Sequence, residues 1–140
     1  MDAAAIAEQV LDRCLRKRKI SEFSLPDTTA FSLSVSMPGS WLTIECDTYQ
    51  TTTAELVAAL DALVRTWARA VEQHGGISNT EGAAATIEPC VRLSPPVAGD
   101  TFVQWHLSAI DMLPQSLALL IHMLVAFDHS VSKLRDVYVG

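Results

Sequence analysis

Charged residues are few in this 140-residue chain. Asp, Glu, Lys and Arg together make up 19% of the sequence, whereas hydrophobic residues make up 49%. With so few charged side chains, the surface of the folded chain is expected to be partly apolar. We therefore expect part of that surface to be buried in a dimer or under a partner. The length fits a single domain over residues 1–140, which is long enough to bury a substantial core.

Cysteine is also rare, and none of its usual patterns is present. The three cysteines lie far apart without a CxxC spacing, which argues against a disulfide framework and a zinc site. Three free thiols fit a reducing compartment. Residues 1–5 do not resemble a signal peptide, and the most apolar run, Leu117–Phe127, is too short to span a bilayer. We therefore expect a soluble cytoplasmic protein without a membrane association.

The motifs of common active sites are missing as well. There is no GxSxG, no GxxxxGK[ST] phosphate loop and no HExxH pair. His122, Asp128 and His129 fall near one helix face and could bind a metal, but no known ligand spacing supports such a site. Glu45 and Asp47 share a strand face, either as a general acid/base pair or, more simply, as an acidic patch. We predict no catalytic residue, no metal and no cofactor.

Basic residues are scarce outside one short segment. Five of the ten lie within residues 13–19, and residues 20–140 carry five basic and thirteen acidic residues, a net charge of −8. An acidic body argues against nucleic acid as the main ligand and suits a basic polypeptide, although acidity also serves solubility alone. The run Arg16–Lys19 could touch nucleic acid or anionic lipid, but at a helix end it more simply compensates the helix dipole.

Three segments show the apolar spacing of helices, namely residues 2–19, residues 52–74 and the stretch from Asp111 or Ser116 to about Tyr138. Thr52 and Glu55 match a capping box at the start of the second helix, and Gly75–Gly76 would end it. The last helix is apolar nearly all round and is expected to be buried on more than one side. Its predicted core residues are Leu120, Ile121 and Leu124, with Leu119 and Met123 on a second surface.

Alternation of apolar and polar residues predicts the strands. The segments 31–37 and 41–49, separated by Pro38–Gly39, are predicted to form a hairpin. Further strands are expected at residues 84–93, where Pro89 suggests an edge or a bulge, and at 101–110, with a possible short strand at 22–25. The element order α-β-β-β-α-β-β-α indicates an α+β fold in which an antiparallel sheet is flanked by helices.

One strand face combines an aromatic residue with acids. Because Leu42, Ile44 and Cys46 form the apolar face of residues 41–49, the alternate residues should point outward. An exposed tryptophan on a sheet is a frequent interface anchor, although half-buried packing explains a strand tryptophan equally well. The candidate partner-binding residues are Trp41, Thr43, Glu45, Asp47 and, from the strand at 101–110, Trp105.

The order and hydropathy of the elements resemble the secretion chaperone-like fold, which includes the class I chaperones of type III secretion and related regulatory domains. The likeness is closest over Phe102–Leu134, where a strand, a turn with Pro114 and a long apolar helix follow one another. The segment Phe31–Tyr49 also fits, so the resemblance covers nearly the whole chain. It implies a homodimer that binds an extended segment of a client polypeptide along its sheet and grooves.

Two other functions fit the same sequence. An immunity or antitoxin protein would use the acidic surface to block a basic toxin by direct binding. A small α+β enzyme is the third hypothesis. The first two are both protein-binding functions, and a neighbouring gene encoding a secreted effector or a toxic nuclease would distinguish them.

Overall fold

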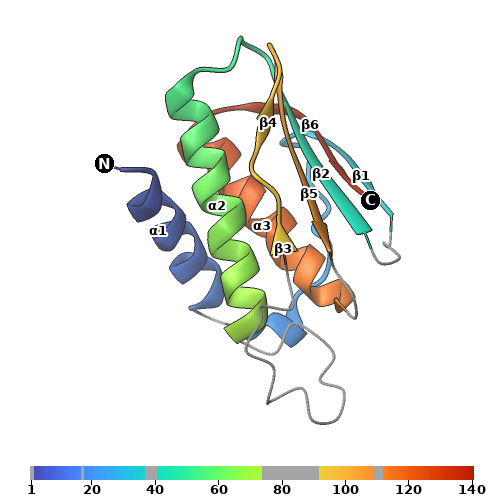
Figure 1. The fold of residues 1–140 in the computed structure, drawn as a ribbon. Helices are drawn as coiled ribbons and strands as arrows, with labels where there is room; N and C mark the ends of the chain where they lie inside the picture. Colours follow the sequence, from blue (N-terminus) through green and yellow to red (C-terminus); the bar gives the residue numbers. More distant parts are fainter. Residues whose placement is uncertain (1, 17, 37–40, 74–91, 109–111) are drawn as a thin grey trace.

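The computed structural model of this chain describes residues 2–16, 18–36, 41–73, 92–108 and 112–140. In this part of the chain three α-helices pack on one face of a six-stranded sheet, so the predicted α+β class is confirmed (Figure 1). The elements in chain order are α1 (Ala3–Leu15), the 3-10 turn η1 (Ile20–Glu22), β1 (Ser32–Val35), β2 (Trp41–Thr48), α2 (Ala54–Gln73), β3 (Arg92–Leu93), β4 (Val97–Ala98), β5 (Phe102–Ser108), α3 (Pro114–Ser130) and β6 (Leu134–Val139).

The sheet is mixed but mostly antiparallel. Its strand order is β1-β6-β2-β5-β3, and β4 also pairs with β5. The β1 and β6 strands are parallel, and the other pairs are antiparallel. The predicted hairpin of residues 31–37 with 41–49 is therefore wrong, because β6 lies between β1 and β2. Alternation fixes the face that each side chain takes, but it does not identify the neighbouring strand.

The last helix is shorter than predicted, and a strand follows it. It ends at Ser130 instead of continuing to Tyr138. The Val131 N–H still donates to the Phe127 carbonyl oxygen at 2.8 Å, but the chain then turns and the Leu134 N–H donates to the buried carboxylate of Asp128 at 2.8 Å. This side-chain acceptor supports the turn from α3 into β6.

Two shorter predictions are also corrected. The α2 helix is capped by Thr53, whose Oγ1 accepts the Leu56 N–H at 3.1 Å, whereas the Thr52 hydroxyl donates to the Gly99 carbonyl at 2.7 Å. The predicted capping box of Thr52 is thus one residue too early. The expected strand at 22–25 is absent, and the turn η1 precedes an irregular segment there. Of the strand expected at 84–93, Arg92–Leu93 is found as β3; the rest, with Pro89 and Gly75–Gly76, lies outside the described residues.

The core lies between the sheet and the three helices, with α3 at its centre. Both predicted surfaces of α3 are buried: Leu119, Leu120, Ile121, Met123 and Leu124 are each fully inaccessible. The surfaces of α3 are covered by α1, α2 and η1 of the same chain. The all-round apolar character of α3 is therefore accounted for within one copy and no longer argues for a dimer. Within the described residues, none of the helices combines the length and apolar content that crossing a bilayer requires.

Candidate functional site

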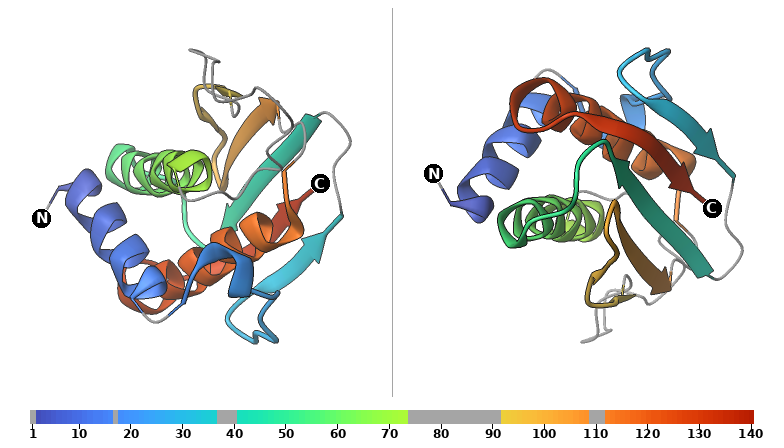
Figure 2. Two further views of the ribbon diagram at one scale, coloured as in Figure 1. Left: turned by 90° about the horizontal axis from the view of Figure 1, so that it is seen from below. Right: turned by 90° about the horizontal axis from the view of Figure 1, so that it is seen from above.

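All three helices pack against one face of the sheet, and the opposite face is not covered by any described helix (Figures 1 and 2). We call this second face the outer face. Cross-strand pairing places alternate residues of β2, β5, β6 and β1 on it. Its residues are Trp41, Thr43, Glu45 and Asp47 from β2, Phe102, Gln104, His106 and Ser108 from β5, Asp136 and Tyr138 from β6, and Ser32 and Ser34 from β1.

Two aromatic side chains are exposed on the outer face. Trp41 is 70% exposed at the start of β2, where it pairs with Ser108. Tyr138 is 43% exposed and pairs with Glu45. The sequence placed Trp41 correctly because its strand alternates strictly. The sequence does not identify Tyr138 as a surface residue of the sheet, because the apolar spacing of α3 continues past Ser130 and predicts a helix there.

The acids of the outer face lie in a polar network. The Gln104 amide donates to the Glu45 carboxylate at 3.1 Å, while Arg135 forms ion pairs with Asp47 at 3.6 Å and with Asp136 at 2.8 Å. Desolvation, followed by the hydrogen bond and negative charge of Asp47, raises the pKa of Glu45 above its ordinary value. Asp47 and Asp136 therefore share one guanidinium, whereas Glu45 is bound by a neutral amide, which leaves this part of the face acidic.

Trp105 lies on the opposite side of the sheet from the other four predicted site residues. It is fully buried between the sheet and α2, and its indole Nε1–H donates to Asp61 Oδ1 at 3.0 Å. Asp61 also accepts a hydrogen bond from Arg65 at 3.0 Å. The inclusion of Trp105 among surface contacts is therefore wrong. Its alternation with Gln104 and His106, both on the outer face, is the signal that places it inside.

Two residues of the metal hypothesis, His122 and Asp128, have separate structural partners. His122 Nε2 lies 2.9 Å from the Ser24 carbonyl oxygen, and its ring meets Phe23 edge-on. Asp128 is buried and holds the Leu134 N–H, with Lys133 Nζ at 3.4 Å, whereas His129 is exposed. Among the described residues, no three His, Cys, Asp or Glu side chains come together in a way that could hold a metal ion.

In the basic run Arg16–Lys19, Lys17 lies outside the described residues, whereas Arg16 and Arg18 have local roles. Arg16 forms an ion pair with Asp12 one turn earlier at 3.0 Å, and the Arg18 guanidinium stacks 4.7 Å from the centre of the Phe23 ring. Cys46 is fully buried on the inner face, where desolvation first and then the nearby Asp47 and Glu45 charges raise its pKa to about 12. A thiol that is buried and protonated at neutral pH cannot attack a substrate in solution.

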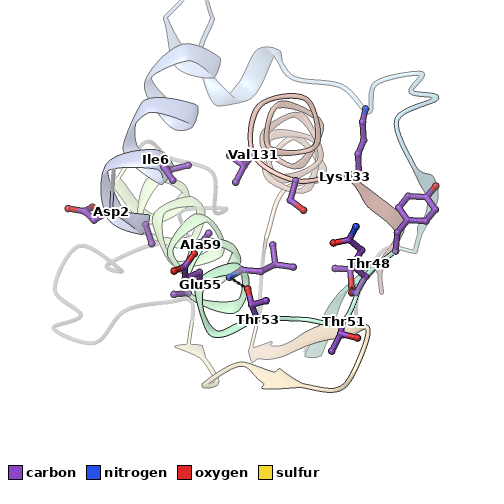
Figure 3. Close-up of a pocket in the computed structure, with 15 residues that line it drawn as sticks. Asp2, Ile6, Thr48, Thr51, Thr53, Glu55, Ala59, Val131 and Lys133 are labelled. Carbon is purple, nitrogen blue, oxygen red and sulfur yellow. Dashed lines mark hydrogen bonds between the residues drawn. The ribbon is translucent and has the colours of Figure 1, made fainter.

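A groove of about 790 Å³ lies away from the outer face, where β2 ends, α1 and α2 begin and α3 turns into β6 (Figure 3). Ile6, Leu56 and Val131 form apolar parts of its lining, and the exposed Tyr49 also lines it. The polar part of the lining is made mainly of Thr48, Gln50, Thr51, Thr53 and Ser132. Sequence reasoning missed this groove because its residues come from separate segments that only the fold brings together.

Comparison of the chain with protein-family models, curated proteins and solved structures gives no match.

Proposed function

We propose that this chain binds another polypeptide through the outer face of its sheet. The observation that carries the proposal is the 70% exposure of Trp41 on a face that no described helix covers. A tryptophan offers a large rigid contact area, and exposing it to water is unfavourable unless a partner covers it. Tyr138 adds a second aromatic contact on the neighbouring β6 strand.

A basic polypeptide segment is the partner that suits this face best. Asp47 and Asp136 share the guanidinium of Arg135, Glu45 accepts a hydrogen bond from the neutral amide of Gln104, and the chain as a whole carries a net charge of −6. Complementary charge accelerates encounter and disfavours acidic competitors. Such a segment would place an apolar residue against Trp41 and a Lys or Arg against the carboxylates. It would then use both the exposed aromatic surface and the negative charge of the outer face.

A client-binding role of the secretion chaperone-like kind is the form of this function that we favour. The α+β class and the long buried α3 after β5 support it, whereas the strand β6 that follows α3 departs from the element order α-β-β-β-α-β-β-α that carries the resemblance. An immunity role would use the same acidic face against a basic toxin. The identity of the partner, a secreted client or a toxin, distinguishes the two.

The test compares two exposed aromatic residues after the native partner has been isolated and identified. Replacing Trp41 by Ala is expected to weaken the affinity by at least about tenfold, the effect of a typical anchor residue. The matched control is Tyr49→Ala, because Tyr49 is 65% exposed but lies beyond the end of β2, where it lines the groove. Calorimetry that gives wild-type affinity for Trp41→Ala would contradict the proposal.

Charge reversal provides a second measurement on the same face. Glu45→Lys is expected to slow association with a basic partner and to reduce its dependence on salt. The single variant is a cleaner test than a double variant with Asp47→Lys, because Asp47 is paired with Arg135 and its reversal would place two cations together. If Glu45→Lys leaves the association rate and its salt dependence unchanged, the acids do not steer the partner.

A further inference from the structure

The two edges of the sheet differ in how well they are protected from pairing with another strand (Figure 2). At one edge β3 and β4 are two-residue pieces separated by Ser94, Pro95 and Pro96. Proline lacks a backbone N–H, and interrupted or charged edge strands are common protection against unwanted pairing. Over the described residues 92–98, this edge does not offer a continuous row of donors and acceptors.

The other edge, β1, has no such protection. It is a continuous Ser-Leu-Ser-Val segment, and within the described residues it pairs only with β6. The Ser36 N–H donates to the Val139 carbonyl at 2.8 Å, which shows that the peptide groups of Ser32, Ser34 and Ser36 are directed at β6. Because these groups alternate in direction along a strand, those of Leu33 and Val35 are directed away from the sheet.

We propose that β1 is the contact through which two copies of this chain pair, antiparallel to each other, about a two-fold axis at Ser34. In this register Leu33 of one copy lies opposite Val35 of the other, with both side chains on the inner face of the sheet. Ser34 of one copy lies opposite Ser34 of the other, with both side chains on the outer face. The outward peptide groups of Leu33 and Val35 then form roughly four hydrogen bonds between the two copies, in hydrogen-bonded pairs that flank the serine pair.

A second copy of this chain fits the edge better than a charged partner does. Residues 28–44 contain no Asp, Glu, Lys or Arg, although the whole chain has a net charge of −6. Because both copies are negatively charged, they would repel each other over most of their surfaces. At the β1 edge two copies can approach without placing like charges against each other. The Ser-Leu-Ser-Val alternation is also self-complementary, as an isologous contact requires.

The difference between the edges also limits the assembly. When β1 is paired with its copy, the edge left at each end of the joined sheet is β3 with β4. Because Pro95 and Pro96 interrupt that edge, further strands cannot be added and the assembly closes as a dimer. The contact involves one short strand from each copy, so we expect a dimer that dissociates on dilution.

The experiment measures the mass of the full chain by sedimentation over a wide range of concentrations. The wild type is expected to move from 15.2 kDa toward twice that mass as its concentration rises. Ser34→Lys places two like charges opposite each other at the axis and is expected to remain monomeric, with unchanged circular dichroism and Tm. The control is Gln9→Lys, which makes the same charge change at an exposed position on α1 and should still dimerise.

Cross-linking tests the register independently of the effect of Ser34→Lys. Serine pairs at such an axis come close enough for a disulfide, so Ser34→Cys should give a 34–34 cross-link on oxidation, identified by mass spectrometry of its peptides. Ser32→Cys faces Ser36 of the second copy and should give no 32–32 cross-link. A wild type that stays at 15.2 kDa throughout, a Ser34→Lys dimer, or no cross-link at Ser34 would overturn the proposal. None of these results depends on binding at Trp41.

Discussion

Trp41 and Trp105 lie on neighbouring antiparallel strands, yet Trp41 is 70% exposed and Trp105 is fully buried. The difference comes from the side of the sheet that each residue takes. Trp105 points toward α2, where Asp61 accepts its indole N–H, whereas Trp41 points toward the face without a helix. Because the helices form a layer on one face only, the inner face supplies stability and the outer face is available for contacts.

The largest expected effect is at the centre of the inner layer. Leu120→Ala should lower the free energy of unfolding by about 2–5 kcal/mol, because Leu120 is fully buried in α3 and its truncation leaves a cavity. Urea denaturation measures this change. Leu25→Ala is the control, since Leu25 is 50% exposed and its truncation should cost far less. Equal midpoints for the two variants would mean that α3 is not the centre of the core.

A smaller effect is expected at the junction of α3 and β6. Asp128→Ala removes the acceptor of the Leu134 N–H at a residue that is only 2% exposed. Leaving that donor without a partner should destabilise the chain by about 1–3 kcal/mol. Asp12→Ala, which removes an exposed ion pair with Arg16, should change stability by less than about 1 kcal/mol. Thermal unfolding of both variants at one pH compares a buried with an exposed aspartate.

The two tryptophans themselves give the most direct test of the comparison. Trp105→Phe loses the hydrogen bond to Asp61 as well as buried volume and should cost about 1–3 kcal/mol. Trp41→Phe should change the free energy of unfolding by less than about 0.5 kcal/mol, because it alters an exposed side chain. Chemical denaturation followed by circular dichroism measures both. Similar losses for the two variants would remove the distinction between the faces.

Local patterns in the sequence predicted much of the inner layer. The alternation of β2 places Leu42, Ile44 and Cys46 inside, and the helical spacing of α2 and α3 identifies their buried residues. The same patterns failed at residues 131–139, because Phe127, Val131 and Leu134 also fit helical spacing. The buried contact of Asp128 with the Leu134 N–H, which spacing does not reveal, accompanies the change from helix to strand.

The candidate surfaces were only partly predictable for a related reason. Trp41, Thr43, Glu45 and Asp47 follow one another along a single strand, so the period of two was enough to group them. Tyr138 joins them through pairing of β2 with β6 and Arg135 through its ion pair with Asp47, and these contacts connect parts of the chain that no local pattern relates. The groove combines four or more segments and depends on the complete fold.

The central position of β6 has a consequence for the order of folding. Ser32 of β1 pairs with Asp136 of β6, so the two paired strands are separated by roughly 100 residues along the chain. Such a separation slows folding, because a long loop must close before the two strands can pair. During synthesis β1 and β2 emerge well before β6, and until it arrives each has an unpaired edge in the place that β6 later fills. In a nascent chain of this protein, these edges of β1 and β2 therefore stay open to mispairing until β6 is made.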